Sequence, residues 1–276
     1  MVICGDVLKV LKTLDSVSVD MGVTSPPYNK QENKKGWLVN NVVYSSSSDK
    51  KDELIYQQEQ IEVLNELYRI IKPGGSFFYN HKIRWEKGDL LHPINWIVQT
   101  NWHLRQEIIW DRGIAANIRG WRFWQTEERI YWLYKPADKK DKIGTELKSK
   151  HALCTSIWKI RPESRNTHPA PYPIAIPTRC IYSIMDEDKG IIIDPYCGSG
   201  TTLVAAKLLG HKYIGIDISD EYIEQTKTRL ENSIDEYEKI KEELLLHTIK
   251  ETFEDRKKRG MYKHKVSSSV NTDNFT

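Results

Sequence analysis

The stretch that decides the fold reads Ile191-Ile192-Ile193-Asp194-Pro195-Tyr196-Cys197-Gly198-Ser199-Gly200-Thr201-Thr202. Its three isoleucines predict a buried strand, which runs into a tight turn that contains two glycines. A helix follows as far as Gly210, and a second strand over 213–216 ends at Asp217. In such units the glycines let the backbone approach a ligand at the helix N-terminus, and the terminal acid accepts hydrogen bonds from ribose hydroxyls. On spacing alone, an ordinary strand-to-helix turn remains the alternative.

Outward from this unit, apolar runs alternate with helical patterns along most of the chain. Strands are predicted over residues 2–4, 18–23, 76–79, 104–110, 129–134, 191–193 and 213–216. A helix with an apolar face is predicted to end before Pro73, and residues 219–258 also have a helical pattern. Residues 30–52 are predicted to be a mobile loop. Strands that alternate with helices predict an α/β fold with a mostly parallel sheet and helices on both faces.

Composition limits the class of protein. The chain is 39% apolar and 29% charged, as in soluble globular proteins, and it has no apolar run long enough to span a membrane. The first six residues lack a signal-peptide pattern, so a cytoplasmic location is expected. The four cysteines are scattered, so neither a metal site nor a disulfide framework is expected. Because the net charge is only +3, any nucleic-acid surface must come from local clusters of basic residues.

A second motif follows the strand over 18–23 and reads Thr24-Ser25-Pro26-Pro27-Tyr28-Asn29. Two consecutive prolines end a strand and remove two backbone donors, so this segment is predicted to be a rigid loop. Such a loop would hold the carbonyls of Ser25 and Pro26 outward, with Tyr28 beside them as a stacking platform. This arrangement suits a planar base that carries an exocyclic amine. A plain surface turn remains the alternative.

Together, the two motifs resemble those of the β class of S-adenosylmethionine-dependent amino-methyltransferases of DNA. Residues 194–202 resemble the family's cofactor loop D-P-F-x-G-S-G-T-T, with Tyr196 in place of Phe, and residues 24–29 resemble its catalytic T-S-P-P-Y-N. Residues 69–76 resemble the R-x-L-K-P-G-G-S stretch, and His168-Pro169 with Pro173 resembles the H-P-A-x-x-P segment. The resemblance spans residues 1–230, with the motifs in the family's order.

The resemblance implies a Rossmann-like methyltransferase fold with a seven-stranded, mostly parallel sheet, circularly permuted so that the catalytic motif precedes the cofactor motif. It implies S-adenosylmethionine as the cofactor, bound by Asp6, Asp194, Tyr196, Gly198, Ser199, Gly200, Thr201 and Asp217. Catalysis is assigned to Ser25, Pro26, Pro27 and Tyr28. In this family the target nucleotide leaves the duplex, Ser25 and the Pro26 carbonyl hold its amine, and Tyr28 stacks on the base. The amine is thereby aligned for direct transfer of the methyl group.

The first residue of the catalytic motif bears on the choice of amine. In this family Ser there is typical of cytosine-N4 enzymes, and Asp or Asn is typical of adenine-N6 enzymes. The resemblance therefore implies a site-specific cytosine-N4 methyltransferase of duplex DNA in a restriction–modification system, with a cognate restriction endonuclease as system partner. Adenine N6 is the nearest alternative, followed by an RNA methyltransferase and a catalytically idle DNA-binding module. A nicotinamide-dependent oxidoreductase would not explain residues 24–29. Many members are dimers, so a homodimer stays open.

One catalytic domain is predicted over residues 1–260, with 136–167 as a small target-recognition segment and 261–276 as a disordered tail. DNA contacts are predicted for Arg112, Arg119, Arg122 and Trp124. Arginines beside aromatic rings suit phosphates, guanines and the space around an extruded base. The alternative is that the tryptophans pack beneath the sheet and the arginines pair with Glu127 and Glu128.

Overall fold

The computed structural model describes residues 1–29, 51–115, 120–144, 147, 155–163, 172–248 and 257–260. Most of the loop predicted over 30–52, parts of the segment 136–167 and the whole tail 261–276 lie outside these residues. No helix among the described residues is long and apolar enough to cross a membrane.

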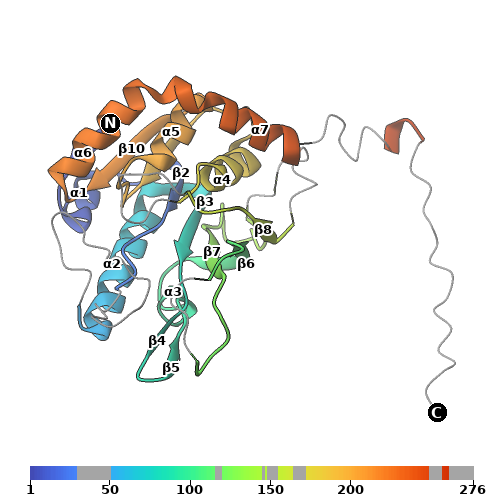
Figure 1. Cartoon of the computed structure of the whole chain (residues 1–276). Helices are drawn as coiled ribbons and strands as arrows, with labels where there is room; N and C mark the ends of the chain where they lie inside the picture. The colour runs from blue at the N-terminus through green and yellow to red at the C-terminus, as the bar shows by residue number, and fades with distance from the viewer. Residues whose placement is uncertain are drawn as a thin grey trace, which may run out of the picture.

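An eight-stranded sheet forms the centre of the molecule (Figure 1). In spatial order its strands are β1 (Val2–Cys4), β10 (Lys212–Asp217), β9 (Ile191–Asp194), β2 (Val19–Thr24), β3 (Ile71–His81), β7 (Glu127–Tyr134), β6 (His103–Asp111) and β8 (Ile157–Lys159). The first five are parallel, β7 is antiparallel to its two neighbours, and β8 is parallel to β6. The predicted mostly parallel α/β sheet is therefore confirmed.

The eighth strand was not expected from the sequence. Strand β8 adds to the edge of the sheet beside β6 and comes from the segment predicted for target recognition. It has three residues, of which Lys159 is charged, so it forms neither an apolar run nor an alternating pattern long enough to be recognised in the sequence.

Helices cover both faces of the sheet (Figure 1). Successive strand residues point to opposite faces, so Phe77 and Phe78 of β3 belong to different apolar clusters. The Phe78 face is covered by α4 (Ala175–Met185), α5 (Thr201–Leu208), α6 (Asp220–Glu231) and α7 (Tyr237–His247). The Phe77 face is covered by α1 (Val7–Thr13), α2 (Glu53–Ile70) and α3 (Ile94–Ile97).

The ends of α2 follow local chemistry. The carboxylate of Asp52 accepts hydrogen bonds from the first backbone N–H groups of α2, as N-cap residues do. The helix ends before Pro73, as predicted. Strand β3 begins at Ile71, earlier than the predicted Ser76, because Ile71 already pairs with Val19 of β2 before a bulge.

Two features depart from the predicted order of elements. Strands β4 (Arg84–Glu86) and β5 (Asp89–Leu91) form an unpredicted hairpin that extends away from α6 and α7 (Figure 1). Its turn residues Lys87 and Gly88 have φ values of 50° and 95°, as a two-residue hairpin turn requires. The helix predicted over 219–258 is divided into α6, a 3₁₀ turn (Ser233–Glu236) and α7.

Candidate active site

Both sequence motifs lie at the same edge of the sheet. The chain leaves β9 toward β10 on one side and leaves β2 toward β3 on the other, so the strand order reverses between β9 and β2. In open α/β sheets, ligands bind in the crevice at such a reversal. Asp194 ends β9 and Thr24 ends β2, and the hydroxyl of Thr24 donates to Asp194 Oδ1 at 2.7 Å. The structure therefore brings together two motifs that are far apart in the chain.

The glycine turn after β9 closely approaches helix α6. Gly198 and Gly200 have φ values of 47° and 80°, in the left-handed region that favours glycine. A Cβ atom at Gly200 would lie 2.7 Å from the side chain of Thr226. The hydroxyl of Thr226 donates to the carbonyl of Gly198 at 2.7 Å. The turn is thus shaped by glycine and held from α6.

Arg229 holds the same turn from the next turn of α6. Its Nη1 donates to Thr201 Oγ1 at 2.8 Å and to the Ser199 carbonyl at 3.1 Å. Its other guanidinium nitrogens donate to Glu236 at 2.7 and 2.9 Å. The predicted cofactor residues Ser199 and Thr201 are 7% and 2% exposed, so their contacts are mainly with the protein. Sequence reasoning missed Arg229, because α6 reads as an ordinary charged helix.

Two acids lie beyond this turn, at the ends of β10 and β1. Asp217 accepts hydrogen bonds from the backbone N–H of Gly198 and of Ser219, both at 2.9 Å, and burial raises the pKa of its carboxyl. Asp6 is exposed and caps α1 by accepting from Lys9 N at 3.0 Å. Asp217 of β10 pairs with Cys4 of β1, and Asp6 lies two residues after Cys4. The two acids therefore lie at the same end of two neighbouring strands.

Asp194 is fully buried beneath the turn rather than exposed to a ligand. Besides the Thr24 hydroxyl, its Oδ1 accepts from the backbone N–H of Tyr196 at 3.1 Å. Burial raises the pKa of Asp194 to about 6, although the hydroxyls of Thr202 and Thr24 act to lower it. This position gives Asp194 a role in shaping the turn from below.

The raised pKa of Asp194 predicts how stability depends on pH. The folded state holds this proton up to about pH 6, whereas the unfolded chain releases it near pH 3.8, so the contribution to stability falls as pH rises between these values. Asp194→Asn resembles the protonated form and keeps an acceptor for Thr24. We expect this variant to melt higher than the wild type at pH 7.5, by about 5 °C, and the difference to shrink at pH 5. Equal melting temperatures at both pH values would contradict the assignment.

Tyr196 stands where the resembling family has Phe, and its hydroxyl has a partner. Gln60 of α2 donates from Nε2 to that hydroxyl at 3.2 Å and accepts from the Tyr79 hydroxyl at 2.9 Å. Burial raises the pKa of Tyr196 above its usual range, so the phenol is protonated. The added hydroxyl therefore joins a buried hydrogen-bond chain between the turn and α2.

The Pro-Pro loop after β2 is the centre of a second hydrogen-bond network. Ser25 Oγ and Tyr28 Oη are 2.7 Å apart, and Tyr28 Oη donates to Glu128 Oε2 at 2.9 Å. Asn80 Nδ2 donates to Tyr28 Oη, Ser25 Oγ and Glu128 Oε2 at 2.7, 3.1 and 3.2 Å. We name Ser25, Tyr28, Asn80 and Glu128 the loop cluster. Asn80 could have been suspected from its place at the end of a buried strand, whereas the sequence indicates Glu128 only as a partner for the nearby arginines.

The loop is also fixed on its other side by α2. The Tyr56 hydroxyl donates to the carbonyl of Pro27 at 2.8 Å. Asn29, which has a φ of 52°, accepts from Lys51 N at 2.7 Å and donates to Glu53 at 3.0 Å. Glu53 in turn receives two 2.7 Å hydrogen bonds from Arg84. The predicted rigid loop is therefore held at several points.

The residues predicted to contact DNA have different surroundings. Arg112 donates from Nη1 to Glu128 Oε1 at 2.8 Å and its side chain is 13% exposed, so for this residue the structure has the alternative in which the arginine pairs with Glu128. Arg122 stacks over Trp85 at 4.1 Å. Trp124 is 64% exposed, which excludes the alternative that this tryptophan packs beneath the sheet. Arg119 lies outside the described residues.

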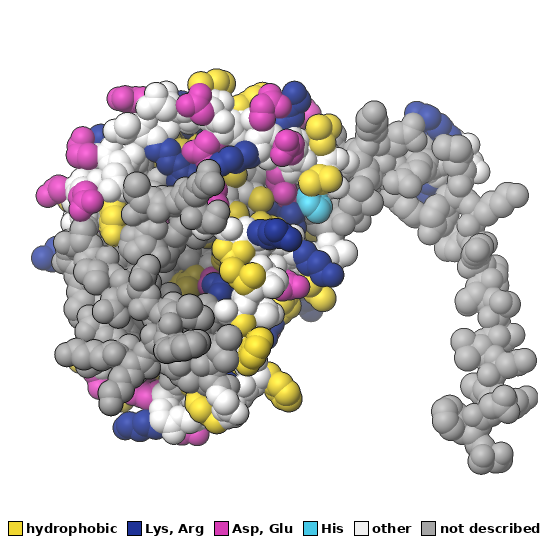
Figure 2. Space-filling view, viewed as in Figure 1, with side chains coloured by type: hydrophobic (Ala, Val, Ile, Leu, Met, Phe, Trp, Pro, Cys, Tyr) yellow, Lys and Arg dark blue, Asp and Glu magenta, His cyan; other side chains and the backbone are white. Residues whose placement is uncertain are grey.

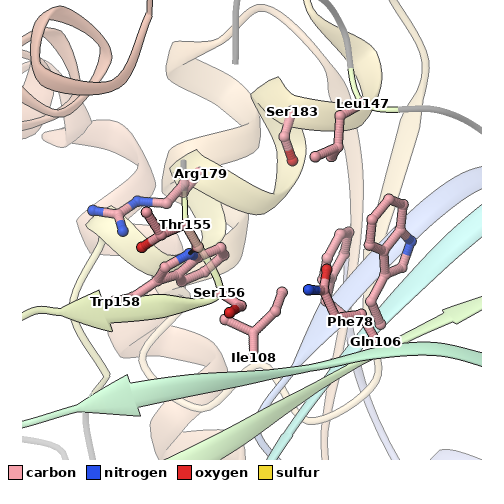
Figure 3. A pocket seen from close by; sticks show the side chains of 10 residues that line it. Phe78, Gln106, Ile108, Leu147, Thr155, Ser156, Trp158, Arg179 and Ser183 are labelled. Atoms are coloured by element: carbon pink, nitrogen blue, oxygen red, sulfur yellow. Dashed lines mark hydrogen bonds between the residues drawn. The ribbon is translucent and has the colours of Figure 1, made fainter. Parts of the chain in front are cut away.

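A cavity of about 70 Å³ lies elsewhere, over strands β3, β7, β6 and β8 on the α4 face of the sheet (Figure 3). Arg179 and Ser183 of α4 face Phe78 of β3, Ile108 of β6 and Trp158 of β8 across it. It is separate from the strand ends where the two motifs meet, so we do not assign it to the candidate active site.

Comparison with known proteins gives a family match. The N6/N4 methylase family model, described as DNA methylase, matches residues 19–228. The type II methyltransferase M.HpaI of Haemophilus parainfluenzae is 28% identical over 88% of this chain and 77% of its own length. M.HinfI of Haemophilus influenzae is also 28% identical, over 82% of this chain and 67% of its own length.

Solved structures share the fold. The PvuII DNA methyltransferase (cytosine-N4-specific) has a TM-score of 0.65 at 19% identity, covering 90% of this chain and 95% of its own. TTHA0409 of Thermus thermophilus, a DNA modification methylase complexed with S-adenosyl-L-methionine, has a TM-score of 0.60 at 22% identity. That match covers 84% of this chain and 95% of the solved one.

Proposed function

This chain belongs to the DNA methylase family of amino-methyltransferases, with S-adenosylmethionine as cofactor, and from that premise we propose its finer function. We propose that it methylates the N4 amine of cytosine at a specific site in duplex DNA, within a restriction–modification system. The observation that carries the proposal is Ser25, presented at the strand-order reversal next to the glycine turn.

The residues at the edge of the sheet fit the cofactor. Gly198 has no side chain to block a ligand, whereas the space beside Gly200 is taken by Thr226, and α5 begins directly after this turn. Asp217 accepts from the backbone N–H groups of Gly198, Ser219 and Ile218, and a carboxylate has about four lone-pair sites, so one remains for a ribose hydroxyl. Asp6 lies beside it, where it can accept from the adenine end. When bound there, S-adenosylmethionine supplies the methyl group.

The catalytic loop would hold the amine. We propose that the Pro26 carbonyl and Ser25 Oγ accept its N–H hydrogens, that Pro27 keeps the loop rigid, and that the Tyr28 ring stacks on the base. Holding both hydrogens turns the nitrogen lone pair toward the methyl donor, which is an orientation effect. No general base is required, because the methylated ammonium loses its proton readily.

The choice of cytosine rests on Ser25 at the first position of the catalytic motif. Adenine N6 is the second candidate, because the matched family model covers both amines. The same hydrogen-bond acceptors would serve either amine, so the identity of the methylated nucleoside decides between them.

The proposed DNA surface lies around residues 121–124. Phe123 is 98% exposed and Trp121 is 58% exposed. The guanidinium of Arg122 lies 4.1 Å from the ring centre of Trp85 and 5.8 Å from that of Trp121. Exposed aromatic rings beside an arginine suit unstacked bases and phosphates, as base flipping requires. Acidic side chains lie instead along the rim over α6 and α7 (Figure 2), where the exposed ones are Asp220, Glu221, Glu224, Glu231, Asp235, Glu238 and Glu242. That rim would repel phosphates.

Replacing both Arg119 and Arg122 with Ala is expected to weaken DNA binding and to lower the slope of log K against log salt by about 2. Each arginine that contacts a phosphate releases about one counterion, so the loss should be largest at low salt. The measurement is fluorescence anisotropy of a labelled duplex over a salt series. Lys239 and Lys241, exposed on α7, provide the matched control when both are replaced with Ala. Equal slopes for the two double variants would contradict the assigned surface.

The partners follow from the proposed reaction. A methyltransferase of this kind works beside a restriction endonuclease that shares its recognition site, and a DNA substrate fits the expected cytoplasmic location. We also propose that the protein can form a homodimer, which sedimentation analysis would test.

The test of the function is to incubate the protein with labelled S-adenosylmethionine and mixed-sequence duplex DNA. The DNA is then digested to nucleosides, which are identified by mass. N4-methylcytosine would support the proposal, and N6-methyladenine would keep the mechanism but change the base. If no methylated nucleoside forms although the cofactor binds, the same assay with RNA distinguishes an RNA enzyme from an idle module.

A further inference from the structure

Glu128 lies at the centre of the loop cluster although it is far from the motif in sequence. It is 6% exposed, Tyr28 is 7% exposed and Asn80 is 1% exposed, whereas Ser25 is partly exposed. The cluster therefore connects a buried carboxylate to a hydroxyl that a substrate can reach. Arg112 completes it by donating to the oxygen of Glu128 that Tyr28 and Asn80 do not use.

The carboxylate decides which way each hydroxyl proton points. A carboxylate beside a guanidinium only accepts hydrogen bonds, so the Tyr28 hydroxyl must donate to Glu128. Its single proton is then used, and in the 2.7 Å contact with Ser25 the tyrosine oxygen must accept. Ser25 is therefore the donor in that contact, although the distance alone allows either direction.

Because Ser25 donates its proton to Tyr28, the Ser25 Oγ atom can act as an acceptor toward a substrate. Its proton points to Tyr28, and Asn80 Nδ2 donates to one of its two lone pairs at 3.1 Å. The other lone pair is left for an incoming N–H. An exocyclic amine donates N–H groups, so a serine that presents a lone pair is the form that can hold it.

We propose that Glu128, held by Arg112, is a positioning residue that sets Ser25 Oγ as the acceptor for the target amine. The inference rests on the proposed amino-methyltransferase function and extends it to two residues outside the catalytic motif. It also gives Arg112 a purpose: because a guanidinium only donates, it keeps an oxygen at position 128 turned toward itself.

Glu128→Gln tests the direction of the hydrogen bonds from Ser25 through Tyr28 to residue 128, because glutamine has nearly the same shape as glutamate. Arg112 would take the amide oxygen of the new side chain, so its NH₂ would face Tyr28 and Asn80. The Tyr28 oxygen would then accept, its proton would turn toward Ser25, and the serine would lose the lone pair that receives the amine. We expect kcat on unmethylated mixed-sequence DNA to fall by about a hundredfold. The Kd for S-adenosylmethionine, measured by calorimetry, should stay within about twofold, because Glu128 contacts no residue of the glycine turn.

Glu128→Asp distinguishes the effect of hydrogen-bond acceptance at position 128 from the effect of side-chain shape. Aspartate shortens the side chain but keeps an acceptor-only group, so this variant should retain more activity than Glu128→Gln although it changes the packing more. The opposite ranking would mean that shape matters and would overturn the inference. The ranking of the two variants remains a test if Glu128→Gln is less stable than the wild type, because Glu128→Asp changes the packing more.

A double-mutant cycle gives the second readout. Tyr28→Phe keeps the ring but removes the hydroxyl that connects Glu128 to Ser25. In that background Glu128→Gln should lower kcat by only about threefold, because coupled groups give non-additive effects. Full additivity would mean that Glu128 acts on stability alone and would overturn the inference.

The neighbouring carboxylate provides the matched control. Glu127 points to the other face of β7, and among the described residues its ion pair is with Arg129 at 3.9 Å. Glu127→Gln should leave kcat and cofactor affinity unchanged. A Glu128→Gln variant that is as active as Glu127→Gln overturns this inference alone. A wild-type protein that methylates no nucleoside overturns the proposed function as well, so the two failures are distinguishable.

Discussion

The Tyr28→Ala variant is expected to lose kcat by at least about a hundredfold while its Kd for S-adenosylmethionine stays within about twofold. The substitution removes the proposed stacking platform and also the hydroxyl that contacts Ser25, Asn80 and Glu128. The glycine turn after β9 is held separately, by Thr226 and Arg229 of α6. Substrate alignment should therefore be lost without loss of the cofactor site.

The measurement for Tyr28 combines single-turnover methylation of mixed-sequence DNA with calorimetric titration of the cofactor. Tyr28→Phe is the control that keeps the ring, and its activity should lie between those of the wild type and Tyr28→Ala. An alanine variant that works within about threefold of the wild-type rate would remove Tyr28 from the base site, because misplacement of a reacting group ordinarily costs far more.

The Asp217→Ala variant is expected to raise the Kd for S-adenosylmethionine by about 30-fold or more. The carboxylate accepts from the N–H groups of Gly198 and Ser219 and is the proposed acceptor for the ribose hydroxyls. Its removal takes away the side-chain support that β10 gives the glycine turn, and the backbone hydrogen bond from Cys197 N to the Ile216 carbonyl at 2.9 Å remains. At saturating cofactor, kcat should fall much less, because the loop cluster around Ser25 does not contact this acid.

Two further variants serve as controls for the Asp217→Ala measurement. Asp217→Asn keeps one acceptor oxygen and should give an intermediate Kd. Glu224→Ala removes an acid on α6 whose side chain is 71% exposed and should bind the cofactor as the wild type does. Unchanged affinity in Asp217→Ala would take this residue out of the cofactor site.

The fold was predictable where its signals were local. The isoleucine strand, the glycine turn and the ordered motifs predicted the α/β class, and the family model that matches residues 19–228 confirms the resemblance. Strand β8 and the hairpin β4–β5 were not predicted, because each strand has three residues that include a charged one, whereas the three residues of β1 are all apolar. The contacts of β8 with β6 depend on a partner far away in the chain.

In the candidate site, too, some residues could be predicted from the sequence and others only from the structure. Sequence patterns were enough to identify Ser25 to Tyr28 and the glycine turn with Asp217, because proline and glycine restrict the backbone locally and leave a recognisable pattern. The folded arrangement was needed to show that Glu128 and Asn80 reach the catalytic loop and that Arg229 braces the glycine turn. It also decided that Arg112 pairs with Glu128, which the sequence had left as one of two alternatives. Those contacts join strands and helices from distant parts of the chain. Hydrogen-bond partners across such distances are set by how the elements pack, and no spacing in the sequence encodes them.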